Sequence, residues 1–318
     1  MRKRGKQVQW GGWASAVVAL WGAAAWGAEP EFTKPTQEEA LKFLQSMPRV
    51  NRDNPPGFVP RFPGERYFVQ LFKDCSIQDI KAMKVVHPGG HVETAPGSGR
   101  FSQRHTRINP SDWKYFTVFE QLEEFGVGHD MENITDECLF YLGQLPQTMR
   151  AIRLEMSEAT GEGIKYLQNL KNLKALSLNF SGTIRDVALE YAGGIPSLEY
   201  IDVRACPAIT GSGVDALSSL KNLKVLKIGS CSLSDLSLNH FKSLPVEELD
   251  MSNVEEGWIV KRRGGATCRF TVTFDGLRRL LASKENLPNL KRLVLRKTSF
   301  SREQKVELAK FKPGLEVL

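Results

Sequence analysis

A short pattern of apolar and polar positions recurs along the chain. It reads apolar-x-x-apolar-x-apolar, where x is any residue, and it is found seven times in full and once in shortened form. The copies are Leu122–Val127, Met149–Leu154, Leu173–Leu178, Leu198–Val203, Leu223–Ile228, Val246–Met251, Leu290–Leu295 and Leu315–Leu318. Their first residues lie 27, 24, 25, 25, 23, 44 and 25 residues apart. Since alternating apolar positions are typical of a half-buried strand, each copy is predicted to form one.

Between these strands, apolar residues recur every three or four positions, as they do in helices. The clearest examples are 135–145, 161–170, 210–220 and 234–244. Thr135, Thr210 and Ser234 stand at the starts of three of them and are predicted to cap the helices. One strand and one helix cannot bury their own apolar face, whereas stacked units share a core. The pattern predicts an α/β solenoid with a curved parallel sheet inside and helices outside.

The repeats resemble those of the leucine-rich-repeat family over roughly residues 109–318. The family typically carries Asn, Cys, Ser or Thr eight residues after each strand start. The residues there are Asp130, Ser157, Ser181, Cys206, Cys231, Val254 and Thr298. Cys206 and Cys231 resemble the cysteine-containing subclass, and similar repeats occur in exported bacterial leucine-rich proteins. The resemblance implies that these side chains bond the backbone of neighbouring coils, with the two cysteines as buried free thiols. Val254 departs from the pattern.

Three regions divide the sequence: 1–28, an N-terminal cap over 29–108 with irregular sequence, and the repeats over 109–318. In the first, four basic residues precede an uncharged stretch over 7–28 that ends in small residues, which is typical of a cleaved signal peptide. A retained membrane anchor and a mitochondrial presequence remain alternatives. The exceptional spacing of 44 marks an insertion over 253–272, which is predicted to form a hairpin at the edge of the solenoid.

Charge and composition narrow the classes of function. The formal net charge is +7, but without the four basic residues at the N-terminus it is +3, which does not indicate a nucleic-acid-binding protein. Five cysteines in 318 residues exclude a disulfide-dense scaffold. The sequence contains no Gly-x-Ser-x-Gly elbow, phosphate loop or zinc-ligand spacing. We therefore predict no catalytic residues, no metal and no cofactor.

The candidate binding surface is the concave face of the sheet. The third, fifth and seventh positions of each copy are predicted to point away from the core. Among them we select Arg153, Glu155, Tyr200, Asp202, Arg204, Lys227, Asp250, Arg292 and Arg296 as partner contacts. Tyr and Arg are favoured anchors in protein interfaces. In the insertion, Trp258 and Arg262 form a second candidate, unless Trp258 packs on the adjacent coil.

Together these features predict an exported, non-enzymatic protein that binds a protein or another macromolecule through the concave face, the insertion or both. The expected location is the periplasm, the cell surface or the extracellular space. Membrane contact is expected only if the N-terminal segment is retained. Two other functions stay open, an intracellular substrate adaptor and an enzyme whose site lies in the N-terminal region. The partner itself does not follow from the sequence.

Overall fold

A computed structural model describes residues 32–47, 72, 75–86, 92–93, 101–102, 106–127, 131–254 and 268–318. Two compact units divide the chain, Met1–Thr33 and Lys34–Leu318, and nearly all the described residues lie in the second. The predicted signal sequence over 1–28 and the candidate contacts Trp258 and Arg262 lie outside the described residues.

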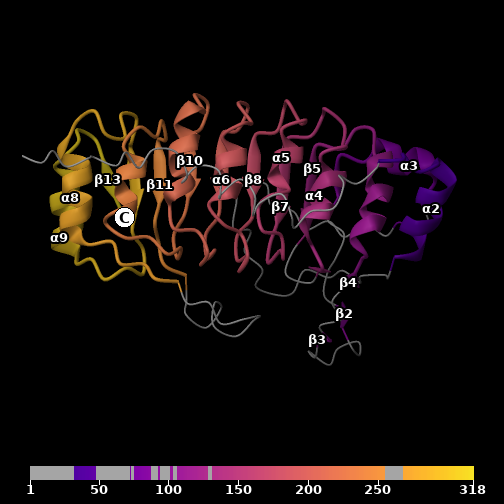
Figure 1. The fold of residues 1–318 in the computed structure, drawn as a ribbon, viewed down its shortest axis with the longest axis horizontal. Helices are drawn as coiled ribbons and strands as arrows, with labels where there is room; N and C mark the ends of the chain where they lie inside the picture. Colours follow the sequence, from indigo (N-terminus) through magenta and orange to yellow (C-terminus); the bar gives the residue numbers. More distant parts are fainter. Residues whose placement is uncertain are drawn as a thin grey trace, which may run out of the picture. The chain divides into compact units, whose positions relative to one another are not determined.

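A parallel sheet of nine strands forms the frame of the unit Lys34–Leu318 (Figure 1). Its strands follow one another in the order of the sequence, so each coil pairs with the coils before and after it. They are β1 (Val85–Val86), β5 (Glu124–Val127), β7 (Ala151–Leu154), β8 (Ala175–Ser177), β9 (Tyr200–Asp202), β10 (Val225–Lys227), β11 (Glu248–Asp250), β12 (Arg292–Val294) and β13 (Glu316–Val317). This arrangement confirms the predicted solenoid, and β1 extends the sheet into the region predicted as a cap.

The register of the strands confirms the repeat phase. Ala175, Tyr200 and Val225 are directly paired on β8, β9 and β10, and each lies two residues after the first leucine of its copy. Those leucines, Leu173, Leu198 and Leu223, are 0%, 0% and 1% exposed. The last copy is the exception. Arg292, two residues after the start of its copy, pairs with Glu316, so the last copy starts at Gly314 and not at Leu315. Gly314, with φ of 76°, makes the turn that shortens this coil by one residue.

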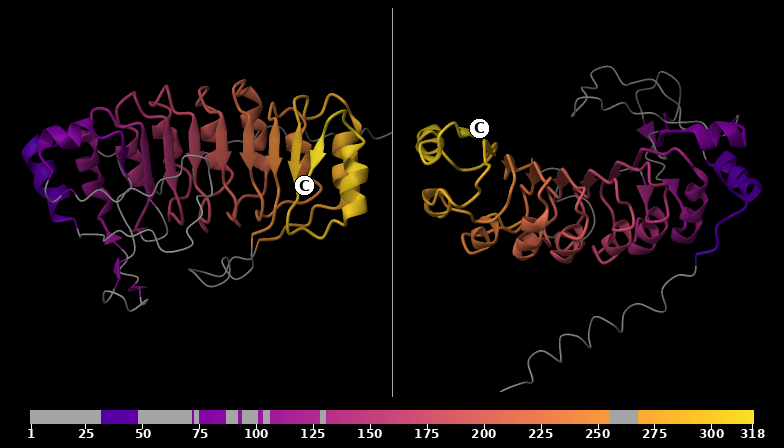
Figure 2. Two further views of the ribbon diagram at one scale, coloured as in Figure 1. Left: turned by 180° about the vertical axis from the view of Figure 1, so that it is seen from behind. Right: turned by 90° about the horizontal axis from the view of Figure 1, so that it is seen from above.

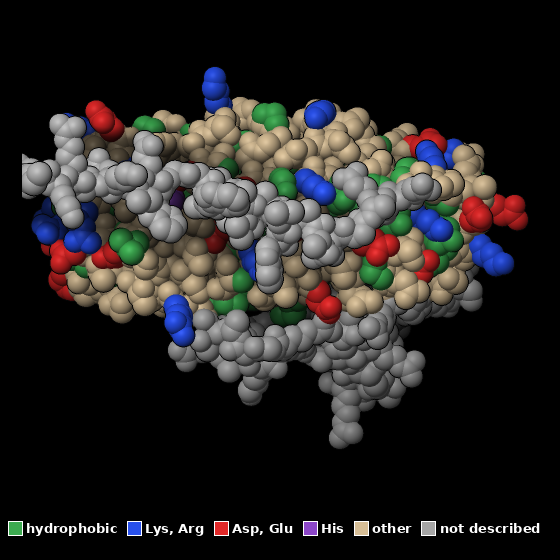
Figure 3. Space-filling model, viewed as in Figure 1, with side chains coloured by type: hydrophobic (Ala, Val, Ile, Leu, Met, Phe, Trp, Pro, Cys, Tyr) green, Lys and Arg blue, Asp and Glu red, His purple; other side chains and the backbone are tan. Residues whose placement is uncertain are grey.

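Helical segments line the other side of the sheet. They are α4 (Asp136–Leu142), α5 (Ile164–Leu167), α6 (Val187–Ala192), η3 (Ser212–Ser219), η4 (Ser237–Phe241), α8 (Phe274–Ala282) and α9 (Arg302–Ala309). Seen from above, the strands lie on the inner side of the arc and the helices on the outer side (Figure 2). Basic and acidic side chains are interspersed on the helical side, with a group of both signs at the end formed by the C-terminal coils (Figure 3).

Two of the predicted helix caps are wrong. The η3 and η4 segments are 3-10 helices whose N-caps are Gly211 and Leu236, not Thr210 and Ser234. For Thr210 the physical reason lies in the neighbouring coil, because its hydroxyl donates to the Asp186 carboxylate at 2.8 Å. The third prediction is confirmed, because Thr135 is the N-cap of α4.

The N-terminal end of the sheet is covered by α2 (Gln37–Ser46), α3 (Ile77–Ala82) and η2 (Pro110–Val118). Their core is aromatic: Trp113 and Phe116 are buried, and each packs on Phe125 of β5, with ring centroids 5.6 and 5.2 Å away. This cluster closes the apolar interior that the first coil would otherwise expose. Four short strands also occur here, β2 (Val92–Glu93) with β3 (Phe101–Ser102) and β4 (Thr106–Arg107) with β6 (Met131–Glu132).

The same turn follows five of the repeat strands. Met156, Phe180, Ala205, Ser230 and Lys297 all have φ between 52° and 58°, and each lies seven residues after the first residue of its copy. A left-handed residue bends the chain sharply from the sheet toward the helical side. Because the turn recurs with the repeat, the residues before it reach the same edge of the face in successive coils.

Candidate functional site

A row of alternating charges crosses the centre of the concave face. Lys227 of β10 is directly paired with Asp202 of β9 on one side and with Asp250 of β11 on the other. All three occupy the fifth position of their copies, as the repeat phase requires. Neighbouring strands lie about 4.8 Å apart, so the three side chains form one continuous group.

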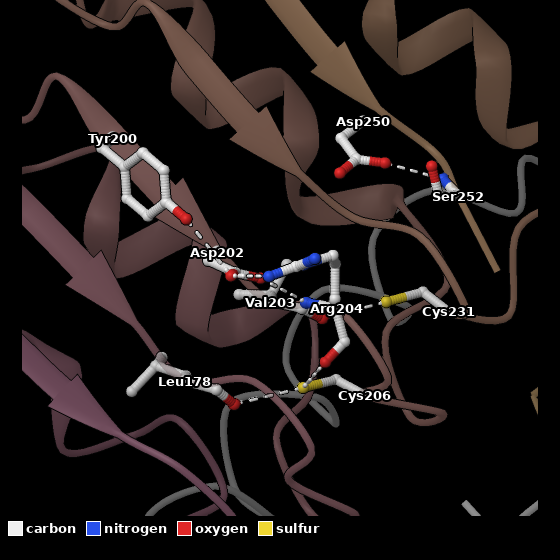
Figure 4. Close-up of polar contacts among 9 residues, drawn as sticks. All are labelled: Leu178, Tyr200, Asp202, Val203, Arg204, Cys206, Cys231, Asp250 and Ser252. Carbon is white, nitrogen blue, oxygen red and sulfur yellow. Dashed lines mark hydrogen bonds and ion pairs between the residues drawn. The ribbon is translucent and has the colours of Figure 1, made fainter. Parts of the chain in front are cut away.

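Asp202 is the fixed centre of this group, although it was predicted as a surface contact. Its side chain is 0% exposed, because neighbours on the same face enclose it. Arg204 holds both carboxylate oxygens, with Nε 3.0 Å from Oδ1 and Nη2 2.7 Å from Oδ2 (Figure 4). The Arg204 backbone N–H donates to Oδ1 at 3.1 Å and the Tyr200 hydroxyl to Oδ2 at 3.3 Å. Asp202 therefore acts on the face through the groups it positions.

These contacts also set the ionisation of the two partners of Asp202. Burial, and after it the nearby Asp202 carboxylate, raise the pKa of Tyr200 well above its ordinary value. Burial opposes the charge of Arg204, but its hydrogen bonds to Asp202 raise the pKa of the guanidinium above its usual range. At neutral pH the face thus presents a neutral phenol beside a permanent cation.

Lys227 and Asp250 complete the centre of the face. The Lys227 Nζ lies 5.5 Å from the centroid of the Tyr200 ring, which is within the range of a cation–π contact. Asp250 is 7% exposed and accepts the Ser252 backbone N–H at 2.9 Å. The Asp202 carboxylate accepts the Arg204 backbone N–H in the same way. Two strands further on, Ser252 therefore takes the place of Arg204.

The other candidate contacts lie apart from this centre. Arg153 on β7 pairs with Glu124 at 3.1 Å, and Glu155 follows the same strand. On the C-terminal side, Arg292 of β12 is exposed and bridges two carboxylates, 2.9 Å from Glu248 and 3.0 Å from Glu316. Arg296 is also exposed. The structure thus brings together Tyr200, Asp202, Arg204, Lys227 and Asp250, and places Arg153, Glu155, Arg292 and Arg296 on either side.

The expected bonds between coils are present behind the face. The Cys206 Sγ donates to the Leu178 carbonyl at 3.3 Å, and the Cys231 Sγ donates to the Val203 carbonyl at 3.1 Å (Figure 4). The Ser157 and Ser181 hydroxyls, at the same position in earlier coils, lie 3.0 Å apart. All five cysteines are free thiols, as predicted for Cys206 and Cys231.

A second set of bonds between coils was not predicted. The buried Asp136 carboxylate accepts the backbone N–H groups of Thr160, Gly161 and Gly163, at 2.9, 3.2 and 2.7 Å, and the Thr160 hydroxyl at 2.9 Å. Two coils later, Asp186 receives Thr210, Gly211 and Gly213 in the same way. The signal in the sequence is Thr-Gly-x-Gly, which occurs at 160–163 and again at 210–213.

Coils without such an aspartate meet the next coil differently. Gly161 occupies the place of Asp136 one coil on, with φ of 105°, and an added Cβ there would lie 2.7 Å from the Ala188 Cβ. Gly211, with φ of 94°, approaches Ser237 in the same manner. Two kinds of joint therefore alternate along this part of the solenoid, a carboxylate joint and a glycine joint.

Within the described residues, no group of three or more His, Cys, Asp or Glu side chains has an arrangement that would hold a metal ion. The described helices include none with the length and apolar character needed to cross a membrane.

Comparison with solved structures finds similarity to two internalins and to TLR13. The internalin inlF of Listeria monocytogenes is 12% identical with a TM-score of 0.41, over 76% of this chain and 62% of its own. Internalin C2 of the same species is 19% identical with a TM-score of 0.36, over 66% of this chain and 74% of its own. TLR13, solved in complex with ssRNA13, is 15% identical with a TM-score of 0.42, over 76% and 36%.

The chain thus spans less than two thirds of inlF and of TLR13. No family model and no curated protein matches the sequence. The sheet order and the repeat register by themselves establish a leucine-rich-repeat fold, which confirms the resemblance found in the sequence.

Proposed function

We propose that the protein is a non-enzymatic binding protein that holds a protein partner on its concave face. The observation that carries this proposal is the central charge row, in which Lys227 lies between Asp202 and Asp250 beside the Tyr200 ring. An interface anchor of this kind combines an aromatic ring with charges of both signs.

The geometry favours recognition by a rigid surface. Both carboxylates of the row are already bonded to neighbouring backbone N–H groups, and Arg204 is held at two points. Side chains that are ordered before binding lose less conformational entropy when the partner arrives. Two carboxylates accompany the single lysine of the row, and this arrangement suits a polypeptide of mixed charge better than a phosphate backbone.

The flanking arginines extend the proposed contact area. Arg153 and Glu155 lie on the N-terminal side of the centre, and Arg292 and Arg296 on the C-terminal side. Trp258 and Arg262 of the insertion are proposed as a further contact at the edge. Removal of 255–267 tests this second surface, since Val254 and Cys268 are the described residues on either side of that segment.

We further propose that the protein is exported. The support is the sequence over 1–28, where a basic start precedes an uncharged stretch. The test is a fusion of residues 1–40 to a reporter that is active only after export. A reporter that stays inactive would favour the intracellular adaptor.

The binding test uses two charge reversals of equal size. Lys227→Glu alters the central row, whereas Lys221→Glu alters an exposed lysine in the loop before β10. The full chain captures partners from the medium or envelope of the cells that produce it, and calorimetry then measures the affinity of each purified partner. We expect Lys227→Glu to weaken binding at least tenfold and Lys221→Glu to leave it unchanged. Equal affinity of both variants and the parent would refute the concave-face proposal.

A further inference from the structure

The segment that begins at Cys268 returns alongside the turn that holds Cys231, which lies 37 residues earlier in the sequence. Past the insertion, the chain returns along the turn that follows β10, where Ser234 and Thr271 form a parallel bridge. These two residues are also 37 apart, so the same register sets Cys268 opposite Cys231. Two hydrogen bonds support it: the Arg269 N–H donates to the Ser232 hydroxyl at 3.3 Å, and the Thr271 N–H to the Leu233 carbonyl at 2.7 Å.

Cys268 therefore takes the position on the next coil that Cys206 and Cys231 occupy on theirs. Counting along the sequence assigns that position to Val254. Cys206, Cys231 and Cys268 follow one another on successive coils, and all three are free thiols. They differ in access to solvent, since Cys206 and Cys231 are fully buried and Cys268 is partly exposed. Besides burial, the nearby Cys206 and Cys268 thiols raise the pKa of Cys231, which is consistent with this proximity.

We propose that Cys268 and Cys231 form a redox modification site that reacts with a small-molecule disulfide such as oxidised glutathione. Directly paired residues on neighbouring parallel segments have Cα atoms about 4.8 Å apart. That separation lies within the range of about 4.4–6.8 Å that a disulfide bond spans. Cys268 is the residue of first attack, because it is the accessible thiol of the series.

The reaction proceeds in two exchanges. The Cys268 thiolate attacks one sulfur of the small disulfide, forms a mixed disulfide and releases one small thiol. Cys231 then gives up its proton and its bond to the Val203 carbonyl, and its sulfur attacks that of Cys268. This step releases the second small thiol. The protein loses two hydrogens and two electrons, and the small disulfide gains them.

Cys206 is excluded from this chemistry by its position. It is fully buried and lies on the coil before Cys231, so it is one coil further from Cys268 than Cys231 is. The new bond would join the coil before the insertion to the segment that returns from it. This inference stands independently of the concave-face proposal, because neither cysteine belongs to the charge row.

The test uses the full chain with Cys75→Ser, which removes the other partly exposed thiol. The folded protein is treated with oxidised glutathione, excess reagent is removed, remaining thiols are alkylated, and peptides are mapped by mass spectrometry. We expect a Cys231–Cys268 link in most molecules, with Cys138 and Cys206 alkylated only after unfolding. Dithiothreitol should restore both thiols.

Two variants separate the steps. Cys231→Ser should retain one glutathione on Cys268, because the second exchange has no thiol, whereas Cys206→Ser should form the link as the parent does. A parent protein that keeps glutathione on Cys268, that links Cys206, or that does not react would overturn the proposal. The peptide map of the parent is decisive by itself, even if a variant fails to fold.

Discussion

The carboxylate joint between coils predicts a large loss of stability on a single substitution. Asp136→Ala removes the acceptor of four hydrogen bonds from a side chain that is 3% exposed. The N–H groups of Gly161 and Gly163 are then left buried without a partner, while those of Thr160 lie close enough to the surface for water to replace the carboxylate. An orphaned buried donor costs about 1–3 kcal/mol, so the free energy of unfolding should fall by about 2–6 kcal/mol.

The matched control is Asp215→Ala in η3. Asp215 is 66% exposed and its side chain pairs with His240 on the helical surface, so its loss should change the free energy of unfolding by less than about 1 kcal/mol. Urea unfolding of both variants and the parent is followed by circular dichroism and by tryptophan fluorescence, and coincident curves establish two-state behaviour. A midpoint for Asp136→Ala that equals the midpoint for Asp215→Ala would refute the reasoning.

Two further predictions concern packing and pH. Gly229→Ala should lower the free energy of unfolding by about 1–3 kcal/mol, because its Cβ would lie 1.9 Å from the Ser252 carbonyl oxygen; Gly182→Ala, with nothing within 4 Å, is the control, and the readout is the urea midpoint. Burial raises the pKa of Cys206 and Cys231 above the free-cysteine value of 9.0, so their stabilisation is complete below pH 9.0 and is lost as pH rises above it. Between pH 9 and 10.5, the free energy of unfolding of the parent should fall more steeply than that of the variant with alanine at both positions, by up to about 1.4 kcal/mol per pH unit for each thiol. Parallel curves for the two proteins would contradict this.

The local sequence pattern predicts the sheet well, because each copy contains the apolar-x-x-apolar-x-apolar spacing. Leu198, Ile201 and Val203 are all buried as their spacing requires. The signature is weaker at the last copy, where Leu315 is buried at 6% exposure but belongs to the turn and not to the strand phase. There, apolar character alone does not distinguish two registers that differ by one residue.

The site was harder to predict because its contacts join side chains at different positions of the repeat and on different coils. A period of two correctly puts Asp202 on the concave face, but the same face buries it under Tyr200 and Arg204, which no strand pattern encodes. Likewise, the bonds from Asp136 reach residues 24 to 27 positions away. The pairing of Cys268 was concealed by the insertion, which breaks the spacing from which a partner would be inferred.

Because the two kinds of joint alternate, the contacts between coils repeat every two coils. The smallest self-consistent building block of the solenoid is a pair of coils, since an aspartate coil is followed by a Thr-Gly-x-Gly coil and then by an aspartate coil again. Deletion of residues 136–185 would set Asp186 directly after Thr135 and keep this order. Deletion of a single Thr-Gly-x-Gly coil would instead place two aspartate coils side by side and leave the first carboxylate without its glycine N–H donors. Lengthening or shortening by whole pairs is therefore the change that this architecture tolerates.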